Sequence, residues 1–95
     1  MNLSDMIPPS TMNTLMAVGV ERERQIEDHD WTPEHDDQQT VANWAWLIGR
    51  RSSDLTCPHP EVVDDPRRLL LEIAAIAVAA IESIDRTTEA RKASE

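Results

Sequence analysis

Pairs of carboxylates spaced to share helical faces are the residues of this chain best suited to chemistry. Glu34 and Asp37 lie three positions apart, as do Glu82 and Asp85, so each pair projects from one side of a helix. Carboxylates on neighbouring helices can hold Mg²⁺ or Mn²⁺, which prefer oxygen ligands. The alternative is that these acids complement helix dipoles and form a solvated surface. The first interpretation predicts a metal site formed by Glu34, Asp37, Glu82 and Asp85.

Paired acidic helices of this kind resemble the metal-binding helices of MazG-type nucleotide pyrophosphohydrolases. That family has Glu-x-x-Glu on one helix and Glu-x-x-Asp on the next. The first half is missing here, because Glu23 and Glu27 are spaced by four. The distant resemblance implies an all-α enzyme that hydrolyses nucleotides with a divalent metal, and the departure puts its metal set in doubt.

Histidine and cysteine supply few further ligands. His29 and His35 flank Trp31 among aspartates and could bind a transition metal, although no His-x-x-x-His or Glu-x-x-His spacing is present. Alternatively, His35 could bond a backbone group or a neighbouring Asp near a helix start. Cys57-Pro58-His59 offers one thiol and one imidazole, too few for a zinc site, and no base is placed beside the thiol. We therefore assign no catalytic residue.

The three tryptophans are the only aromatic residues. Trp44 falls on the apolar stripe of its predicted helix, which indicates a core position. Trp46 falls off that stripe and could face a ligand or a partner subunit. Trp31 precedes a helix start, where it could cover a pocket or stack on a base, or act as an apolar staple before the cap.

Arginines come in close pairs that could meet phosphate groups. Arg22 and Arg24 lie among acids that could neutralise them, and Arg50-Arg51 follow the second predicted helix, where cations suit the dipole. Arg67-Arg68 open the last helix, where cations are slightly unfavourable. A helix N-terminus with Arg side chains can bind an anion, and a solvated pair is the alternative. The candidate ligand-binding residues are aromatic or cationic: Trp31, Trp46, Arg22, Arg24, Arg67 and Arg68.

The element that must position these side chains is the apolar run from Leu69 to Ile84. Asp65-Pro66 is a strong helix start, because Asp caps free N–H groups and Pro is tolerated at the first position. Apolar residues then recur at three and four positions, giving a face broader than a coiled-coil seam. Glu72 and Glu82 interrupt the run, which is too short to span a bilayer. We predict a core or subunit-interface helix.

Two shorter helices are expected before it. Pro8-Pro9 ends an N-terminal arm, and Thr32-Pro33-Glu34 opens a second helix that should stop at Gly49, with a loop over 50–64. No segment alternates with period two, so we predict an all-α three-helix bundle, antiparallel or orthogonal. The predicted organisation is a flexible arm over 1–9, a single domain over 10–88 with helices over about 11–28, 33–48 and 66–88, and a disordered tail over 89–95.

Composition limits the partners. A 95-residue chain forms one small domain whose monomer would be marginally stable, so the long apolar helix suggests a homo-oligomer. A net charge of −9 argues against direct nucleic-acid binding and against anionic membranes, and permits metal binding or mimicry of a polyanion. The single cysteine fits a reducing cytoplasm, and residues 1–7 lack the pattern of a signal peptide.

Three motifs resemble a family of small, largely uncharacterised proteins from tailed phages and prophages. The match covers roughly residues 20 to 86. Asp30 stands where the family has Gly before Trp, and Ala80 where a Glu often sits, which weakens a metal role for that helix. The resemblance implies an all-α fold and the cytoplasm of an infected bacterium, and it brings no activity. The motifs are Glu21-Arg22-x-Arg24-Gln25, Trp31-Thr32-Pro33-Glu34-His35-Asp36-Asp37 and Ile81-Glu82-x-Ile84-Asp85-Arg86.

Binding is favoured over catalysis, because no complete catalytic set is present. The leading hypothesis is a phage accessory homo-oligomer that sequesters a nucleotide-like ligand or host factor and so counters host antiviral immunity, with no cofactor. Trp31 and Trp46 would stack on bases, and Arg pairs would meet phosphates. The first alternative is a Mg²⁺- or Mn²⁺-dependent MazG-like pyrophosphohydrolase that uses the four carboxylates. The second is an acidic inhibitor of a nucleic-acid-binding host protein, acting by charge mimicry.

Overall fold

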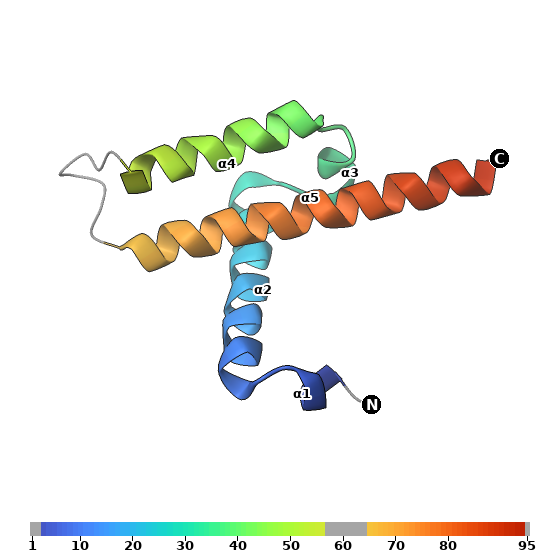
Figure 1. Cartoon of the computed structure of the whole chain (residues 1–95). Helices are drawn as coiled ribbons and strands as arrows, with labels where there is room; N and C mark the ends of the chain where they lie inside the picture. The colour runs from blue at the N-terminus through green and yellow to red at the C-terminus, as the bar shows by residue number, and fades with distance from the viewer. Residues whose placement is uncertain (1–2, 57–64, 95) are drawn as a thin grey trace.

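The computed structural model describes residues 3–56 and 65–94, and every element within these ranges is a helix (Figure 1). The prediction of an all-α fold is therefore confirmed for the described residues. The helices in chain order are α1 (Leu3–Met6), α2 (Pro9–His29), α3 (Pro33–Asp36), α4 (Val41–Thr56) and α5 (Pro66–Ser94).

The long helix α5 is the element on which the others pack. Helices α2, α3 and α4 all contact it, and Figure 1 shows α4 running beside α5 while α2 crosses it steeply. Asp65 caps α5, since its Oδ1 accepts the Arg68 backbone N–H at 3.1 Å, as the Asp-Pro start predicted. The helix continues past the expected end near 88, through residues for which a tail was expected, to Ser94. Arg91 and Lys92 in its last turn suit the negative end of the dipole.

The prediction of one helix over 33–48 was wrong. The chain instead forms α3 and α4, separated by residues 37–40. Two contacts explain the break. The Asp37 side chain is held by α5 through Arg86, and the Thr40 hydroxyl accepts the Asn43 backbone N–H at 3.1 Å, which starts a new helix.

The predicted stop at Gly49 was also wrong. Helix α4 passes through Gly49 to Thr56, and Gly49 has no positive φ, so it does not form a left-handed cap. The part of α4 after Gly49 still contacts α5, where the Arg51 guanidinium lies 3.9 Å from the Glu72 carboxylate. The expected loop over 50–64 therefore begins no earlier than 57, and residues 57–64 lie outside the described ranges.

The core is small and centred on α5. Trp44 packs with Ile76, Ala79 and Ala80, and Trp31, Leu47 and Ile48 lie against this cluster. Alanine leaves little bulk on α5, so α4 can bring the large Trp44 ring against it. The prediction that Trp44 is a core residue is confirmed. None of the helices in the described ranges combines the length and hydropathy needed to cross a bilayer.

Candidate functional site

A buried ion pair fastens the segment over residues 31–37 to α2. Arg22 Nη2 donates to Asp36 Oδ2 at 2.6 Å, and the two side chains are only 9% and 1% exposed. Arg22 Nη1 also donates to the Trp31 carbonyl at 3.0 Å. Arg22, predicted to contact a ligand, therefore lies inside a polar network of the chain itself.

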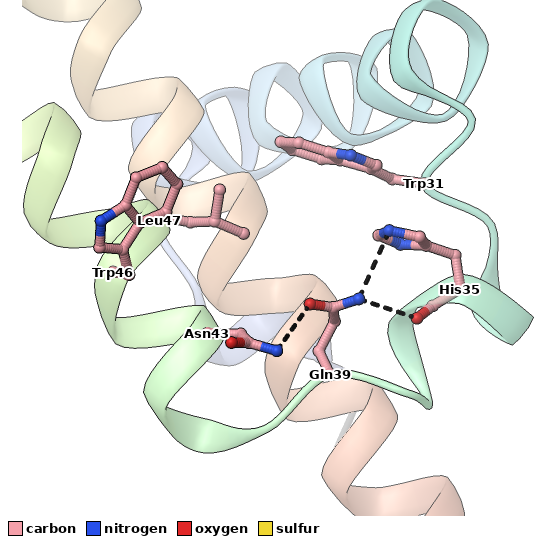
Figure 2. A pocket seen from close by; sticks show the side chains of 6 residues that line it. All are labelled: Trp31, His35, Gln39, Asn43, Trp46 and Leu47. Atoms are coloured by element: carbon pink, nitrogen blue, oxygen red, sulfur yellow. Dashed lines mark hydrogen bonds between the residues drawn. The ribbon is translucent and has the colours of Figure 1, made fainter.

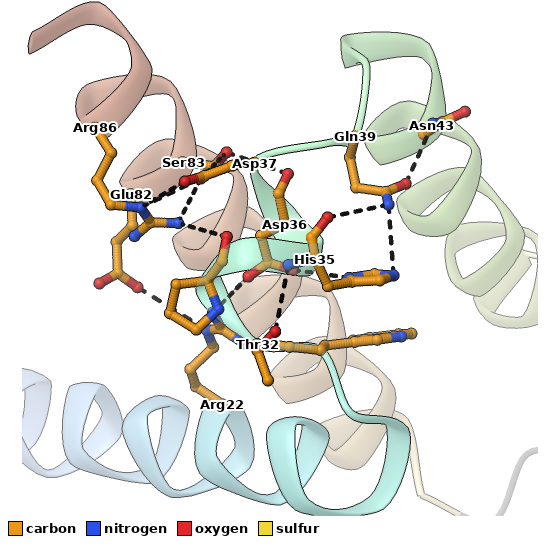
Figure 3. A network of polar contacts seen from close by, with 12 residues as sticks. Arg22, Thr32, His35, Asp36, Asp37, Gln39, Asn43, Glu82, Ser83 and Arg86 are labelled. Atoms are coloured by element: carbon orange, nitrogen blue, oxygen red, sulfur yellow. Dashed lines mark hydrogen bonds and ion pairs between the residues drawn. The ribbon is translucent and has the colours of Figure 1, made fainter. Parts of the chain in front are cut away.

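Asp37 fastens the same segment to α5. Its carboxylate accepts from Arg86 Nη2 and from the Ser83 hydroxyl, both at 2.8 Å, and the same hydroxyl lies 3.2 Å from the Asp36 carbonyl oxygen. The hydrogen bond from Arg86, followed by that from Ser83, holds the pKa of Asp37 below its usual value. This carboxylate therefore stays ionised, and its oxygens are hydrogen-bonded to Arg86 and Ser83 (Figure 3).

The three motifs that carry the phage-protein resemblance meet at these contacts. Arg22 comes from the first motif, Asp36 and Asp37 from the second, and Arg86 from the third. Asp30, which stands where that family has Gly, ends α2 with φ 57°. This left-handed conformation favours glycine, although Asp tolerates it. The motifs thus share one structural task, which is to seat residues 31–37 between α2 and α5.

The four carboxylates predicted as metal ligands point to different neighbours. Glu34 and Asp85 are exposed, Asp37 is bound by Arg86, and Glu82 Oε1 lies 3.9 Å from Arg22 Nε. Within residues 3–56 and 65–94, no three His, Cys, Asp or Glu side chains are placed to hold one metal ion. The Cys57 thiol and the His59 imidazole lie outside the described ranges.

The other predicted arginines lie away from the tryptophans. Arg24 makes a bidentate ion pair with Glu21, with N–O distances of 2.7 and 2.8 Å, and a further hydrogen bond to Asp28 at 2.8 Å. The bond from Arg24 lowers the pKa of Glu21. Arg67 borders a separate pocket between α2 and α5, and its neighbour Arg68 is exposed at the same helix start. Of the six predicted ligand contacts, Trp31 and Trp46 line one pocket together, and Arg22 touches only the Trp31 carbonyl.

These two tryptophans line one pocket of about 330 Å³, which we call the tryptophan pocket. Figure 2 shows Trp46 on one side and Trp31 with His35 on the other. Two amide side chains lie between them, and Asn43 Nδ2 donates to Gln39 Oε1 at 3.2 Å. The tryptophan pocket therefore combines aromatic surfaces with hydrogen-bonding amides. It is lined by Trp31, His35, Gln39, Asn43, Trp46 and Leu47.

His35 connects the tryptophan pocket to the polar network. Its ring is parallel to that of Trp31 within 7°, with the centroids 6.5 Å apart, which is an offset stack. Its Nδ1 lies 3.3 Å from Asp36 Oδ1 and its Nε2 lies 3.4 Å from the Gln39 amide nitrogen. The tautomer that donates from Nδ1 to Asp36 leaves Nε2 to accept from Gln39. The buried ion pair thus helps to orient a ring that faces the pocket.

Two cations border the tryptophan pocket on its α4 side. The Arg50 guanidinium lies 5.7 Å from the Trp46 ring centroid, and that of Arg51 lies 5.9 Å from the Trp31 ring. Both arginines line a second hollow of about 420 Å³ that shares Trp31 and Leu47 with the first. Arg51 also donates to the Leu47 carbonyl at 3.2 Å. A ligand that extends from one hollow to the other would meet these two arginines and also the carboxylates of Asp54 and Glu72, which line the second hollow.

Sequence reasoning missed Gln39, Asn43 and Arg50 as site residues. A usable pattern existed, because Asn43, Trp46 and Arg50 recur at three and four positions and so share one side of a helix. The predicted helix end at Gly49 hid this pattern, since it placed Arg50 in a loop.

In comparisons with known proteins, the chain matches no protein-family model, no curated protein and no solved structure. The geometry of the site itself is therefore the basis for proposing a function.

Proposed function

We propose that the protein binds a nucleotide-like small molecule in the tryptophan pocket and holds it without chemical change. The observation that carries this proposal is that Trp31 and Trp46, fifteen positions apart, line one pocket together with two amide side chains. Most of the Trp46 side chain is exposed, at 62%, so its ring face is available to a planar ligand. Because the Trp46 side chain is mostly exposed, it contributes little to the packing of the core.

Each part of a nucleotide has a chemical counterpart in this arrangement. A base can stack on an aromatic face, which contributes about 1–3 kcal/mol. The Gln39 amide is held by His35 and Asn43, whereas the Asn43 amide can exchange hydrogen bonds with a base edge that presents both a donor and an acceptor, as adenine does. Arg50, over the Trp46 ring, can meet a phosphate. The volume of about 330 Å³ falls within the range of small-molecule pockets.

The charge of the chain favours a small ligand over a polynucleotide. A net charge of −9 would repel the long phosphate backbone of a nucleic acid. A mononucleotide or short cyclic nucleotide needs only a local cation. In the phage setting that the resemblance implies, a homo-oligomer of such a binder would sequester a nucleotide signal and counter host immunity.

The enzyme alternative lacks a supporting observation in the described residues. A Mg²⁺-dependent pyrophosphohydrolase needs several carboxylates on one metal ion, whereas Asp37 binds Arg86 and Glu82 lies near Arg22. The acidic-inhibitor alternative depends on net charge alone. We therefore keep ligand binding as the proposed function.

The test is equilibrium dialysis of the purified chain against linear and cyclic nucleotides, with and without Mg²⁺. We expect one class of nucleotide to be retained without Mg²⁺ and to be recovered intact after heat denaturation. Trp46→Ala should weaken its binding by about 10- to 100-fold, from the loss of stacking. Val41→Ala is the matched control, because Val41 is exposed on the same helix and lies outside the tryptophan pocket. Retention of no nucleotide, or conversion that requires Mg²⁺, would refute the proposal.

A further inference from the structure

Helix α5 is apolar on the side turned away from the core as well as on the side that faces it. Ala75, Ile76 and Ala79 are buried, whereas Leu70, Ile81 and Ile84 are 55%, 58% and 48% exposed. In Figure 1, α4 lies along one side of α5 and α2 passes across another, and part of the α5 surface has no described helix over it. An apolar helix face is normally buried against another element. We define the outer face of α5 by spacing as Leu70, Ile73, Ala74, Ala77, Ile81 and Ile84. At its N-terminal end this face borders α2, because Leu70 and Ala74 line a hollow with Val18 of that helix.

The outer face carries no charge along its length. The two acids within this stretch of sequence belong to other sides of the helix. Glu72 lies 3.6 Å from Arg24 and 3.9 Å from Arg51, and Glu82 lies 3.9 Å from Arg22. In a chain with a net charge of −9, this is a surface on which two copies can meet without bringing like charges into contact.

The four large residues of the outer face are arranged symmetrically about Ala77. Leu70 and Ile84 lie seven positions before and after it, and Ile73 and Ile81 lie four positions before and after it. A twofold interface brings the same patch of both copies together and must be self-complementary. An antiparallel pair of α5 helices crossing at Ala77 meets this condition, and the small Ala77 side chain allows close approach.

Charges at the two ends of the outer face favour the antiparallel direction. Arg67 and Asp85 are both exposed and lie eighteen positions apart, which is five helical turns, so they project from the same flank of α5. In an antiparallel pair centred on Ala77, Arg67 lies ten positions before the centre and Asp85 eight positions after it. Arg67 of one copy therefore comes within two positions, about 3 Å along the helix axis, of the level of Asp85 in the other, which the long Arg side chain can span, and this happens twice. In a parallel pair Arg67 would instead come level with its own counterpart. This pairing gives Arg67 a role at a helix start, where a cation is otherwise unfavourable.

We propose that two copies of this chain associate through the outer face of α5, antiparallel and centred on Ala77, with Arg67 of each copy paired to Asp85 of the other. This inference specifies the homo-oligomer suggested above and does not depend on the identity of the ligand. The dimer can therefore be tested separately from ligand binding in the tryptophan pocket.

Light scattering coupled to size exclusion tests the surface. We expect the full chain to have the mass of two copies, and Ile81→Glu to weaken association by at least about 10-fold. Val41→Glu is the matched control, because it adds the same charge at another exposed apolar position, on α4, and should remain dimeric. Circular dichroism should report the same helix content for both variants. A monomeric parent chain, or a dimer that tolerates Ile81→Glu, would overturn the proposal.

The direction of pairing is tested with engineered cysteines in a Cys57→Ser background. When Leu70→Cys and Ile84→Cys proteins are mixed and oxidised, we expect the mixed cross-linked dimer to predominate. Arg67→Asp and Asp85→Arg should each weaken the dimer, and the two changes together should restore it. Self-cross-linking of each single variant in place of the mixed product would show parallel pairing and refute the proposed arrangement.

Discussion

The polar network around Arg22 and Asp36 and the tryptophan pocket share the segment 31–37, yet their side chains are used in opposite ways. In the network, Asp36 is 1% exposed and its charge is met by Arg22 at 2.6 Å. In the pocket, Trp46 is 62% exposed and its ring faces open space. The motif residues build the network and also give the pocket Trp31 and His35, whereas Gln39, Asn43 and Trp46 lie outside the motifs. In this protein the most distinctive sequence motif therefore supplies the scaffold and one side of the candidate site, and helix α4 supplies the other side.

The largest effect is expected from breaking the network. Asp36→Asn leaves the buried Arg22 guanidinium without its counter-charge, so the free energy of unfolding should fall by about 3–5 kcal/mol. Urea denaturation followed by circular dichroism measures this loss. Replacing both partners together, as Arg22→Met with Asp36→Leu, should recover much of the stability, because no unpaired charge remains. A loss below about 1 kcal/mol for Asp36→Asn would show that the pair does not hold the segment.

A second, intermediate effect is expected from pH. The pKa values of Asp37 and Glu21 are lowered in the folded protein by Arg86 and Arg24, so the folded state binds fewer protons than the unfolded state near these values. Their contribution to stability is therefore full above the ordinary pKa values of 3.8 and 4.5. It is lost as the pH falls through the lower folded values. Denaturation curves from pH 7 to pH 3 should show falling stability, with a shallower fall for Asp37→Asn. If the stability of that variant falls with pH as steeply as that of the parent chain, Asp37 does not contribute to the pH dependence.

The smallest effect is expected at Gly49 of α4, a position that belongs neither to the network nor to the lining of the pocket. Gly49 lies inside the helix without a positive φ, and a Cβ there would meet nothing within 4 Å. Gly49→Ala should therefore raise the free energy of unfolding by roughly 0.5–1 kcal/mol. Gly19→Ala is the parallel case in α2, where a Cβ is equally unobstructed. Destabilisation by Gly49→Ala would instead indicate that the helix ends at Gly49, as the sequence alone suggested.

Features determined by neighbouring residues were predictable from the sequence. The helix starts at Pro33 and Pro66 follow from local capping, and the core position of Trp44 follows from helical spacing. The break between α3 and α4 was only partly predictable, because the Thr40 cap is local but Asp37 is held by Arg86, which is 49 positions away. The same break sets how Trp31 and Trp46 come to line one pocket, so their proximity could not be derived.

The most direct test of the account is the unfolding of the parent chain and of Trp46→Ala with the nucleotide retained in dialysis. Without nucleotide, the two should have nearly the same free energy of unfolding, because the Trp46 side chain is largely exposed. At a nucleotide concentration of about 100 Kd, the parent chain should gain about 2.7 kcal/mol. Trp46→Ala should gain about half of that or less. Equal stabilisation of both proteins would contradict the assignment of the tryptophan pocket as the binding site.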